Sequence, residues 1–191
     1  MDLIEAAGRG DVGAVRQALA DGAGVNGRDV CDRTAITAAA LGDHVDVARV
    51  LIDAGANVDL QDADRNNPLL VTGETGSVAM LREVLKGAPN LGATNRYGGV
   101  AVIPASDRGH VDYVREILET DIDVDHVNNL GWTALLETVL LGDGDAAHVE
   151  ILGLLLDAGA DRSIADRDGV TALEHARSRG YDEMVRLLEA A

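Results

Sequence analysis

The sequence predicts an all-α fold, a solenoid of about six stacked helix-turn-helix pairs joined by β-hairpin-like loops. The first observation is an internal repeat: a Thr-Ala-Leu-type tripeptide starts at positions 34, 67, 100 and 133, a constant spacing of 33, and again at 171. Such a period marks supersecondary units that bury their apolar faces against one another. The second observation is composition, because aromatic residues make up 2% of the chain and Phe is absent. Thin Ala- and Leu-rich layers need few large side chains.

The repeats divide the chain into units of one domain, residues 1–191. Leu-Leu-type pairs in short periodic segments predict helices with one buried face in each unit. The terminal units carry polar residues that suit the uncovered ends of a stack. The predicted units are a first helix pair at 1–28, full repeats at 29–61, 62–94, 95–127 and 128–165, and a terminal unit at 166–191.

Short signals mark where the helices begin and end. Thr133 precedes a first helix and can accept a hydrogen bond from a free amide there. Gly131 stands in the preceding turn, where a positive φ is often needed. Gly55 and Gly159 follow second helices, where a left-handed residue closes the last turn. Asp121 takes that place in the third full repeat, and Asp tolerates this backbone better than most residues.

These motifs recur in one register. The chain carries Asn129-Leu130-Gly131-Trp132-Thr133-Ala134-Leu135, Gly109-His110-Val111 and Asp157-Ala158-Gly159-Ala160-Asp161. Over essentially its whole length it resembles ankyrin-repeat proteins. The stretches 94–99, 103–105, 130–137 and 142–144 resemble most of all the small solitary bacterial members. The resemblance implies a protein-binding module without naming its partner. It places the contact surface on the concave side, built from hairpin tips and the first helix of each pair.

The resemblance implies contact positions just before the Thr-like residue and seven to eight residues after it. Trp, Tyr and Arg are the usual interface anchors, so Trp132, Tyr97 and the neighbouring arginines are the strongest candidates. The alternative for Trp132 is packing on its own hairpin. The implied positions are Asp64, Asn66, Glu74, Thr75, Arg96, Tyr97, Asp107, Arg108, Asn129, Leu130, Trp132, Leu140, Leu141, Arg167, Asp168 and Arg179.

Two further places depart from the repeat pattern. Glu137 and His175 are polar at a position that is commonly apolar, so they need partners; they could face each other, or help to form a ligand site with Glu74 and Arg108. The insertion at 142–148 brings in Asp143 and Asp145, which alternate as in part of a calcium loop but lack its later acidic ligands. We therefore expect no metal there. The resemblance assigns His148 to bracing the turn between helices.

Composition narrows the partner class. The net charge is −17, which argues against unaided binding to nucleic acid and favours a partner with a basic surface. A single cysteine, Cys31, fits a reducing compartment. The N-terminus shows no signal peptide and no segment is long enough to span a membrane. We expect a cytoplasmic monomer without cofactor.

Three functional hypotheses remain open at this point. The first is an adaptor or scaffold that binds a protein through the concave face. The second is an inhibitor or immunity-type protein that uses its acidity to cover a basic active site. The third is a small-ligand sensor or enzyme built around Glu74, Arg108, Glu137 and His175. Catalytic motifs such as G-x-S-x-G and H-E-x-x-H are missing from the sequence, so we expect no enzyme. Acidic groups gathered on one face favour the inhibitor, and acidic groups spread over the back favour the adaptor.

Overall fold

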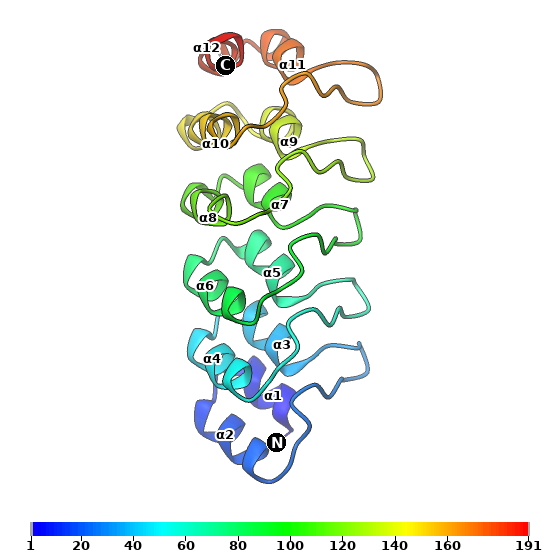
Figure 1. The fold of residues 1–191 in the computed structure, drawn as a ribbon, viewed down its shortest axis with the longest axis vertical. Coiled ribbons are helices and arrows are strands. Elements are labelled where there is room, and N and C mark those ends of the chain that lie inside the picture. The colour runs from blue at the N-terminus through cyan, green and yellow to red at the C-terminus, as the bar shows by residue number, and fades with distance from the viewer. Residues whose placement is uncertain (1, 191) are drawn as a thin grey trace. The chain divides into compact units, whose positions relative to one another are not determined.

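The computed structural model describes residues 2–190, and these residues form α-helices without any β-strand, as expected (Figure 1). They fall into two compact units, which divide between Arg96 and Tyr97. The prediction of one domain over residues 1–191 stays a prediction. The six helix pairs of the described residues confirm the predicted fold class.

The first unit contains three helix pairs. First helices pack on first helices and second helices on second helices, so that α3 contacts α1 and α5, while α4 contacts α2 and α6. Each pair therefore buries its apolar face against its neighbours, as the repeat predicts. The helices are α1 (Leu3–Gly8), α2 (Val12–Ala20), α3 (Ala35–Leu41), α4 (Val45–Asp53), α5 (Pro68–Thr75) and α6 (Val78–Lys86).

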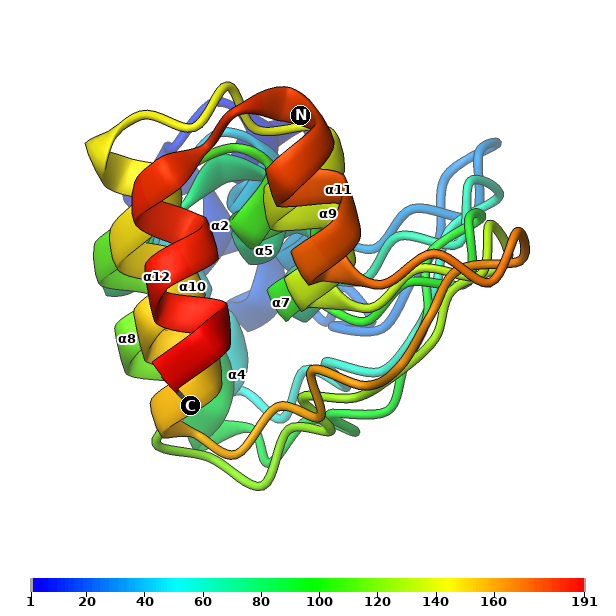
Figure 2. The same cartoon turned by 90° about the horizontal axis from the view of Figure 1, so that it is seen from above.

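The second unit repeats the arrangement. Here α9 contacts α7 and α11, and α10 contacts α8 and α12. Figure 2 shows that the loops preceding the first helices project on the side away from the second helices. The helices are α7 (Val102–Asp107), α8 (Val111–Ile117), α9 (Ala134–Leu140), α10 (Ala146–Asp157), α11 (Ala172–Arg179) and α12 (Asp182–Ala190).

The predicted helix boundaries are mostly confirmed. The Thr133 side chain caps α9 by accepting from the Leu136 amide at 3.2 Å, and Gly131 has a φ of 89°. The left-handed backbone predicted at Asp121 is wrong, since Asp121 is not among the positive-φ residues. The amides of Glu119 and Thr120 instead bond to carbonyls three residues back, so tight turns end this helix.

Candidate functional site

A buried or partly buried Asp or Asn at the base of four hairpins fixes the tip. In the hairpin before α9, Asn128 Oδ1 accepts from the amides of Leu130 at 2.9 Å and Trp132 at 3.1 Å. In the hairpin before α5, Asp62 Oδ1 accepts from Asp64 at 3.0 Å and Asn66 at 2.8 Å. Asp29 and Asp166 make the same pair of bonds in their hairpins. The predicted contact residues of these tips therefore stand on ordered backbone.

Neighbouring hairpins within each unit are also tied together. In the first unit, Arg96 lies 3.6 Å from the Asp64 carboxylate. In the second unit, the Asn129 amide donates to the Tyr97 carbonyl at 2.9 Å, and the Arg167 guanidinium donates to the Asn129 carbonyl. The structure thus places these five predicted residues on connected tips, with both charge signs present.

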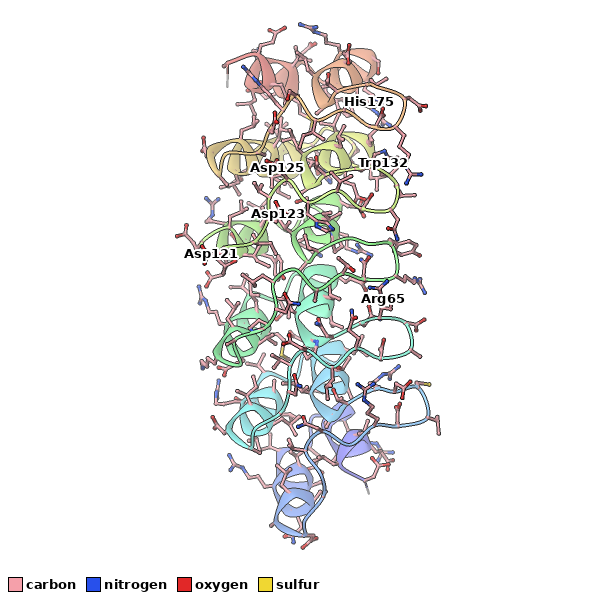
Figure 3. The ribbon with its side chains drawn as sticks, turned by 45° about the vertical axis from the view of Figure 1, so that its right-hand side comes forward. Arg65, Asp121, Asp123, Asp125, Trp132 and His175 are labelled. Atoms are coloured by element: carbon pink, nitrogen blue, oxygen red, sulfur yellow. The ribbon has the colours of Figure 1, made fainter. Side chains whose placement is uncertain are left out.

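Three predicted contact residues of the second unit expose apolar surface. Tyr97 and Leu130, on hairpins, are 53% and 47% exposed, and Leu141, at the end of α9, is 50% exposed. Trp132 is only partly exposed, and its amide and carbonyl both bond to Asn128 at the hairpin base. Figure 3 shows Trp132 on this hairpin. Tyr97 and Leu130 are therefore better placed than Trp132 to contact a partner.

Glu137 is a buried acid on the first-helix side of the second unit. Its residue exposure is 6%, and its Oε1 accepts from Asn128 Nδ2 at 2.7 Å. Burial, helped by the negative charge of Asp107, raises the pKa of the Glu137 carboxyl to about 7, although the Asn128 hydrogen bond and the positive charge of Arg108 oppose the shift. Arg108 in turn lies 3.6 Å from the Asp107 carboxylate. Asp107 and Arg108, both predicted contact residues, thus form one cluster with Glu137.

The predicted pairing of Glu137 with His175 is wrong. His175 Nε2 lies 2.7 Å from Asp166 Oδ2, while Glu137 bonds to Asn128. In both cases the partner is the residue nine positions earlier, at the base of the preceding hairpin. These partners were not predicted, although a polar residue nine positions after an Asn or Asp indicates them. Glu74 lies on α5 in the other unit. The ligand site of Glu74, Arg108, Glu137 and His175 therefore stays a prediction.

Two histidines near the starts of second helices brace successive helix pairs, as the resemblance implied for His148. His148 Nε2 bonds to the Asp107 carbonyl at 3.0 Å, and His44 Nε2 bonds to the Gly8 carbonyl at 3.1 Å. Each histidine therefore reaches the end of the preceding first helix. In the second unit this bond also anchors the 142–148 insertion beside Asp107.

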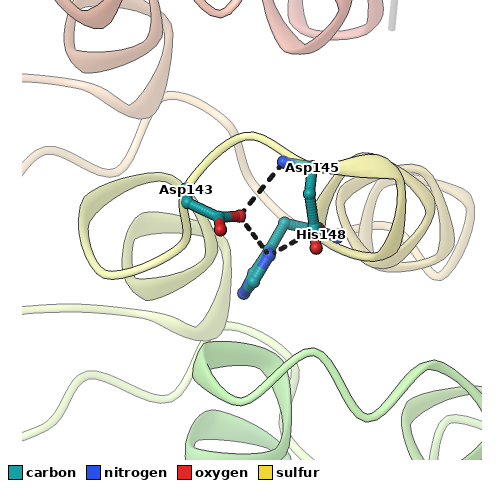
Figure 4. Close-up of side chains that lie close together, drawn as sticks. All are labelled: Asp143, Asp145 and His148. Atoms are coloured by element: carbon teal, nitrogen blue, oxygen red, sulfur yellow. Dashed lines mark hydrogen bonds and ion pairs between the residues drawn. The ribbon is translucent and has the colours of Figure 1, made fainter.

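The insertion gathers the side chains that come nearest to a metal-binding set in residues 2–190. Potential ligand atoms of Asp143, Asp145 and His148 lie within 4.8 Å of one another (Figure 4). His148 Nδ1 is 2.8 Å from Asp145 Oδ1 and 3.5 Å from Asp143 Oδ1. Burial opposes protonation of His148, but its bonds to the Asp107 carbonyl and Asp145 together raise its pKa. Asp145 also caps α10, so helix capping and the contact with His148 both hold this carboxylate in place.

Comparison with known proteins settles the family. Residues 3–95 and 105–190 match the family described as "Ankyrin repeats (3 copies)". The chain belongs to the ankyrin-repeat family. This confirms the resemblance, and ankyrin repeats are generally protein–protein interaction modules.

Bacterial ankyrin-repeat proteins are among the relatives that match this chain over nearly its whole length. The ankyrin repeat protein YahD of Escherichia coli (strain K12) is 40% identical over 191 residues, which cover 100% of this chain and 95% of the relative. A solved ankyrin repeat domain from Acinetobacter baumannii AYE is 42% identical with a TM-score of 0.95, covering 98% of this chain and 96% of that one. The ankyrin repeat domain of Bcl-3 has a TM-score of 0.88 at 25% identity, over 100% of this chain and 85% of that domain.

None of the helices in residues 2–190 is both long enough and apolar enough to cross a bilayer.

Proposed function

We propose that this ankyrin-repeat protein is an adaptor that binds a partner protein through its hairpin tips and the ends of its first helices. The observation that carries the proposal is where exposed apolar surface lies. Among residues 2–190, the exposed large apolar side chains stand on hairpins, at the ends of first helices, or in the segment leading into a hairpin. They are Val30, Leu41, Tyr97, Val127, Leu130 and Leu141. Exposed apolar side chains gathered on ordered backbone are typical of interaction sites.

The acidic side chains lie mostly elsewhere. In the second unit they follow α8, where Glu119, Asp121 and Asp123 are exposed (Figure 3), and they continue on the outer faces of α8 and α10 with Asp112 and Glu150. The hairpin tips instead mix arginine with aspartate. This spread of acid over the second-helix side favours an adaptor over an inhibitor that covers a basic active site. The matching partner surface is apolar at its centre, with both charge signs around it.

Substitution of the exposed anchors tests the proposal. The variant Tyr97→Asp with Leu130→Asp places charges on two exposed tips, and the control Glu119→Ala with Asp121→Ala changes two exposed residues after α8. Each is used to capture the partner from native cells, and circular dichroism checks the fold. We expect the tip variant to lower affinity at least about tenfold, since central anchors commonly contribute about 2 kcal/mol, and the control to bind normally. Loss of binding in the control alone would place the interface on the second-helix side.

A further inference from the structure

The hairpin before α9 differs from the others in what closes its base. Asn128 uses Oδ1 to hold the amides of Leu130 and Trp132, and its Nδ2 donates to the buried Glu137 at 2.7 Å. The hairpin before α5 has the same amide bonds on Asp62, but the residue nine positions later is the apolar Val71. One hairpin is therefore closed onto a buried acid, and the other is not.

We propose that Glu137 is a proton-dependent latch for the 128–132 hairpin: the protonated acid keeps the hairpin base closed, and ionisation favours its opening. The physical reason is the cost of a buried charge. An ionised Glu137 has one hydrogen bond from Asn128, with the Asp107 carboxylate nearby, and it gains solvation when the hairpin moves away. The latch itself does not depend on the proposed function. Only its effect on binding does, because this hairpin presents Leu130 to the proposed partner.

The charges around Glu137 come from the elements packed against α9, which are α7, α10 and α11. Asp107 at the end of α7 disfavours ionisation, and Arg108 next to it favours ionisation. The Arg108 guanidinium lies 3.6 Å from the Asp107 carboxylate and donates to the Pro104 carbonyl at 3.3 Å. Because of these contacts, it offsets the negative charge of an ionised Glu137 only in part. Other titratable side chains on α10 and α11 contact other groups or lie at helix ends. His148 bonds to Asp145 and the Asp107 carbonyl, Glu150 to Arg115, Glu174 to Thr171, His175 to Asp166 and Arg177 to Glu189. Arg179 lies 6.0 Å from the Tyr181 ring, and Asp157 is the last residue of α10.

Burial and these neighbouring charges together set the pH range in which the latch responds. Burial raises the pKa of Glu137 from 4.5 to about 7, so its protonation changes near neutral pH. An opened hairpin exposes Glu137 to water, where its pKa returns to the ordinary value. Linkage then requires the opening equilibrium to rise with pH between these two values and to level off above them.

Hydrogen exchange of the free, full-length protein tests the latch without any partner. Protection factors of the Leu130 and Trp132 amides are measured from pH 5 to pH 8. A protection factor is a ratio to the intrinsic exchange rate, so the pH dependence of that rate cancels. We expect their opening constants to increase on the order of 70-fold over this range. The amides of Asp64 and Asn66, held by Asp62, serve as the control within the same molecule and should show no such rise.

The variant Glu137→Gln keeps the size and one acceptor of the side chain but cannot ionise. It should hold the protection of Leu130 and Trp132 constant over the same range. A rise that persists in the variant, an equal rise in both hairpins, or no rise in the natural protein would each overturn the latch. The two-hairpin comparison needs no variant, so the test stands even if Glu137→Gln does not fold. Failure here leaves the binding proposal intact, because that proposal is tested by partner capture.

Discussion

Asn128 and Glu137 form a buried hydrogen bond of 2.7 Å, with the amide nitrogen donating to the carboxylate. The next repeat contains the same contact with the roles exchanged, because the Asp166 carboxylate accepts from His175 at the same distance. In both repeats the pair joins the base of a hairpin to the first helix that follows it. The two pairs are chemically complementary. In the first, the hairpin residue donates and the helix residue accepts, and in the second, the helix residue donates and the hairpin residue accepts.

This complementarity predicts the outcome of exchanging one pair for the other. Asn128→Asp alone places two carboxylates together, and we expect a loss of roughly 1–3 kcal/mol in the free energy of unfolding at pH 7. Adding Glu137→His recreates the pair seen at 166 and 175 and should recover most of that loss. Urea denaturation of the four proteins in the cycle measures the coupling. Additive effects would show that the contact contributes nothing.

The raised pKa of Glu137 predicts that stability depends on pH. Because the folded pKa, about 7, exceeds the unfolded value of 4.5, the folded state binds the proton more tightly. The resulting stabilisation is fully present below about pH 4.5 and is lost as the pH rises through 7. From pH 5 to pH 8 the natural protein should lose at most about 3 kcal/mol relative to Glu137→Gln. Urea melts of both proteins at these two pH values provide the check, and parallel pH profiles would contradict it.

A salt bridge in the first unit predicts the opposite pH dependence. The buried Glu83 of α6 accepts from Lys86 Nζ at 2.8 Å and from Arg49 Nη2 of α4 at 3.0 Å, and these bonds, Lys86 first, lower its pKa. Its contribution is present above the unfolded pKa and is lost as the pH falls through the folded value.

Replacing this acid measures that contribution. Glu83→Gln should cost about 1 kcal/mol at pH 7, since Arg49 and Lys86 both reach into solvent. The stability difference between the natural protein and Glu83→Gln should be smaller at pH 3 than at pH 7. Thermal melts of both proteins at the two pH values measure it. An unchanged difference at both pH values would mean that packing, not charge, explains the cost.

An unsatisfied donor in the first unit predicts a stabilising substitution. Asn67 caps α5 through Oδ1, which accepts from Leu70 at 2.9 Å, but its buried Nδ2 has no hydrogen-bond partner among the described residues. Thr occupies the equivalent place at Thr133 and caps α9 with a hydroxyl, which has one donor where the Asn amide has two. Asn67→Thr should therefore raise the free energy of unfolding by about 1 kcal/mol. The reverse change, Thr133→Asn, is the matched control and should lower it; stabilisation by both changes would refute the explanation.

The fold could be predicted from the sequence because each repeat carries its own boundaries. The 33-residue spacing, the capping Thr133 and the positive φ of Gly131 are local properties, and local properties repeat when the sequence repeats. Asp121 could not be predicted in the same way. Ala88, at the equivalent place one repeat earlier, has a φ of 49°, whereas consecutive tight turns end the helix before Asp121.

The candidate site was only partly predictable. The positions of Tyr97, Leu130 and Leu141 followed from the family pattern, and the structure finds them exposed. The partners of Glu137 and His175 did not follow from it, because that pattern relates equivalent positions of adjacent repeats. The hydrogen bonds run within each repeat instead, from helix to hairpin base.

The most direct test of the binding account maps the partner on the surface of the protein. A photoreactive phenylalanine analogue replaces Tyr97, Leu130 or Leu141 in one set of proteins, and Asp112 or Glu119, on or just after α8, in the matched set. All five residues are exposed. After irradiation in native cells, we expect one and the same protein to be linked from the first set and to be missing from the second. A partner linked only from Asp112 and Glu119 would contradict a binding surface made of hairpin tips and first helices.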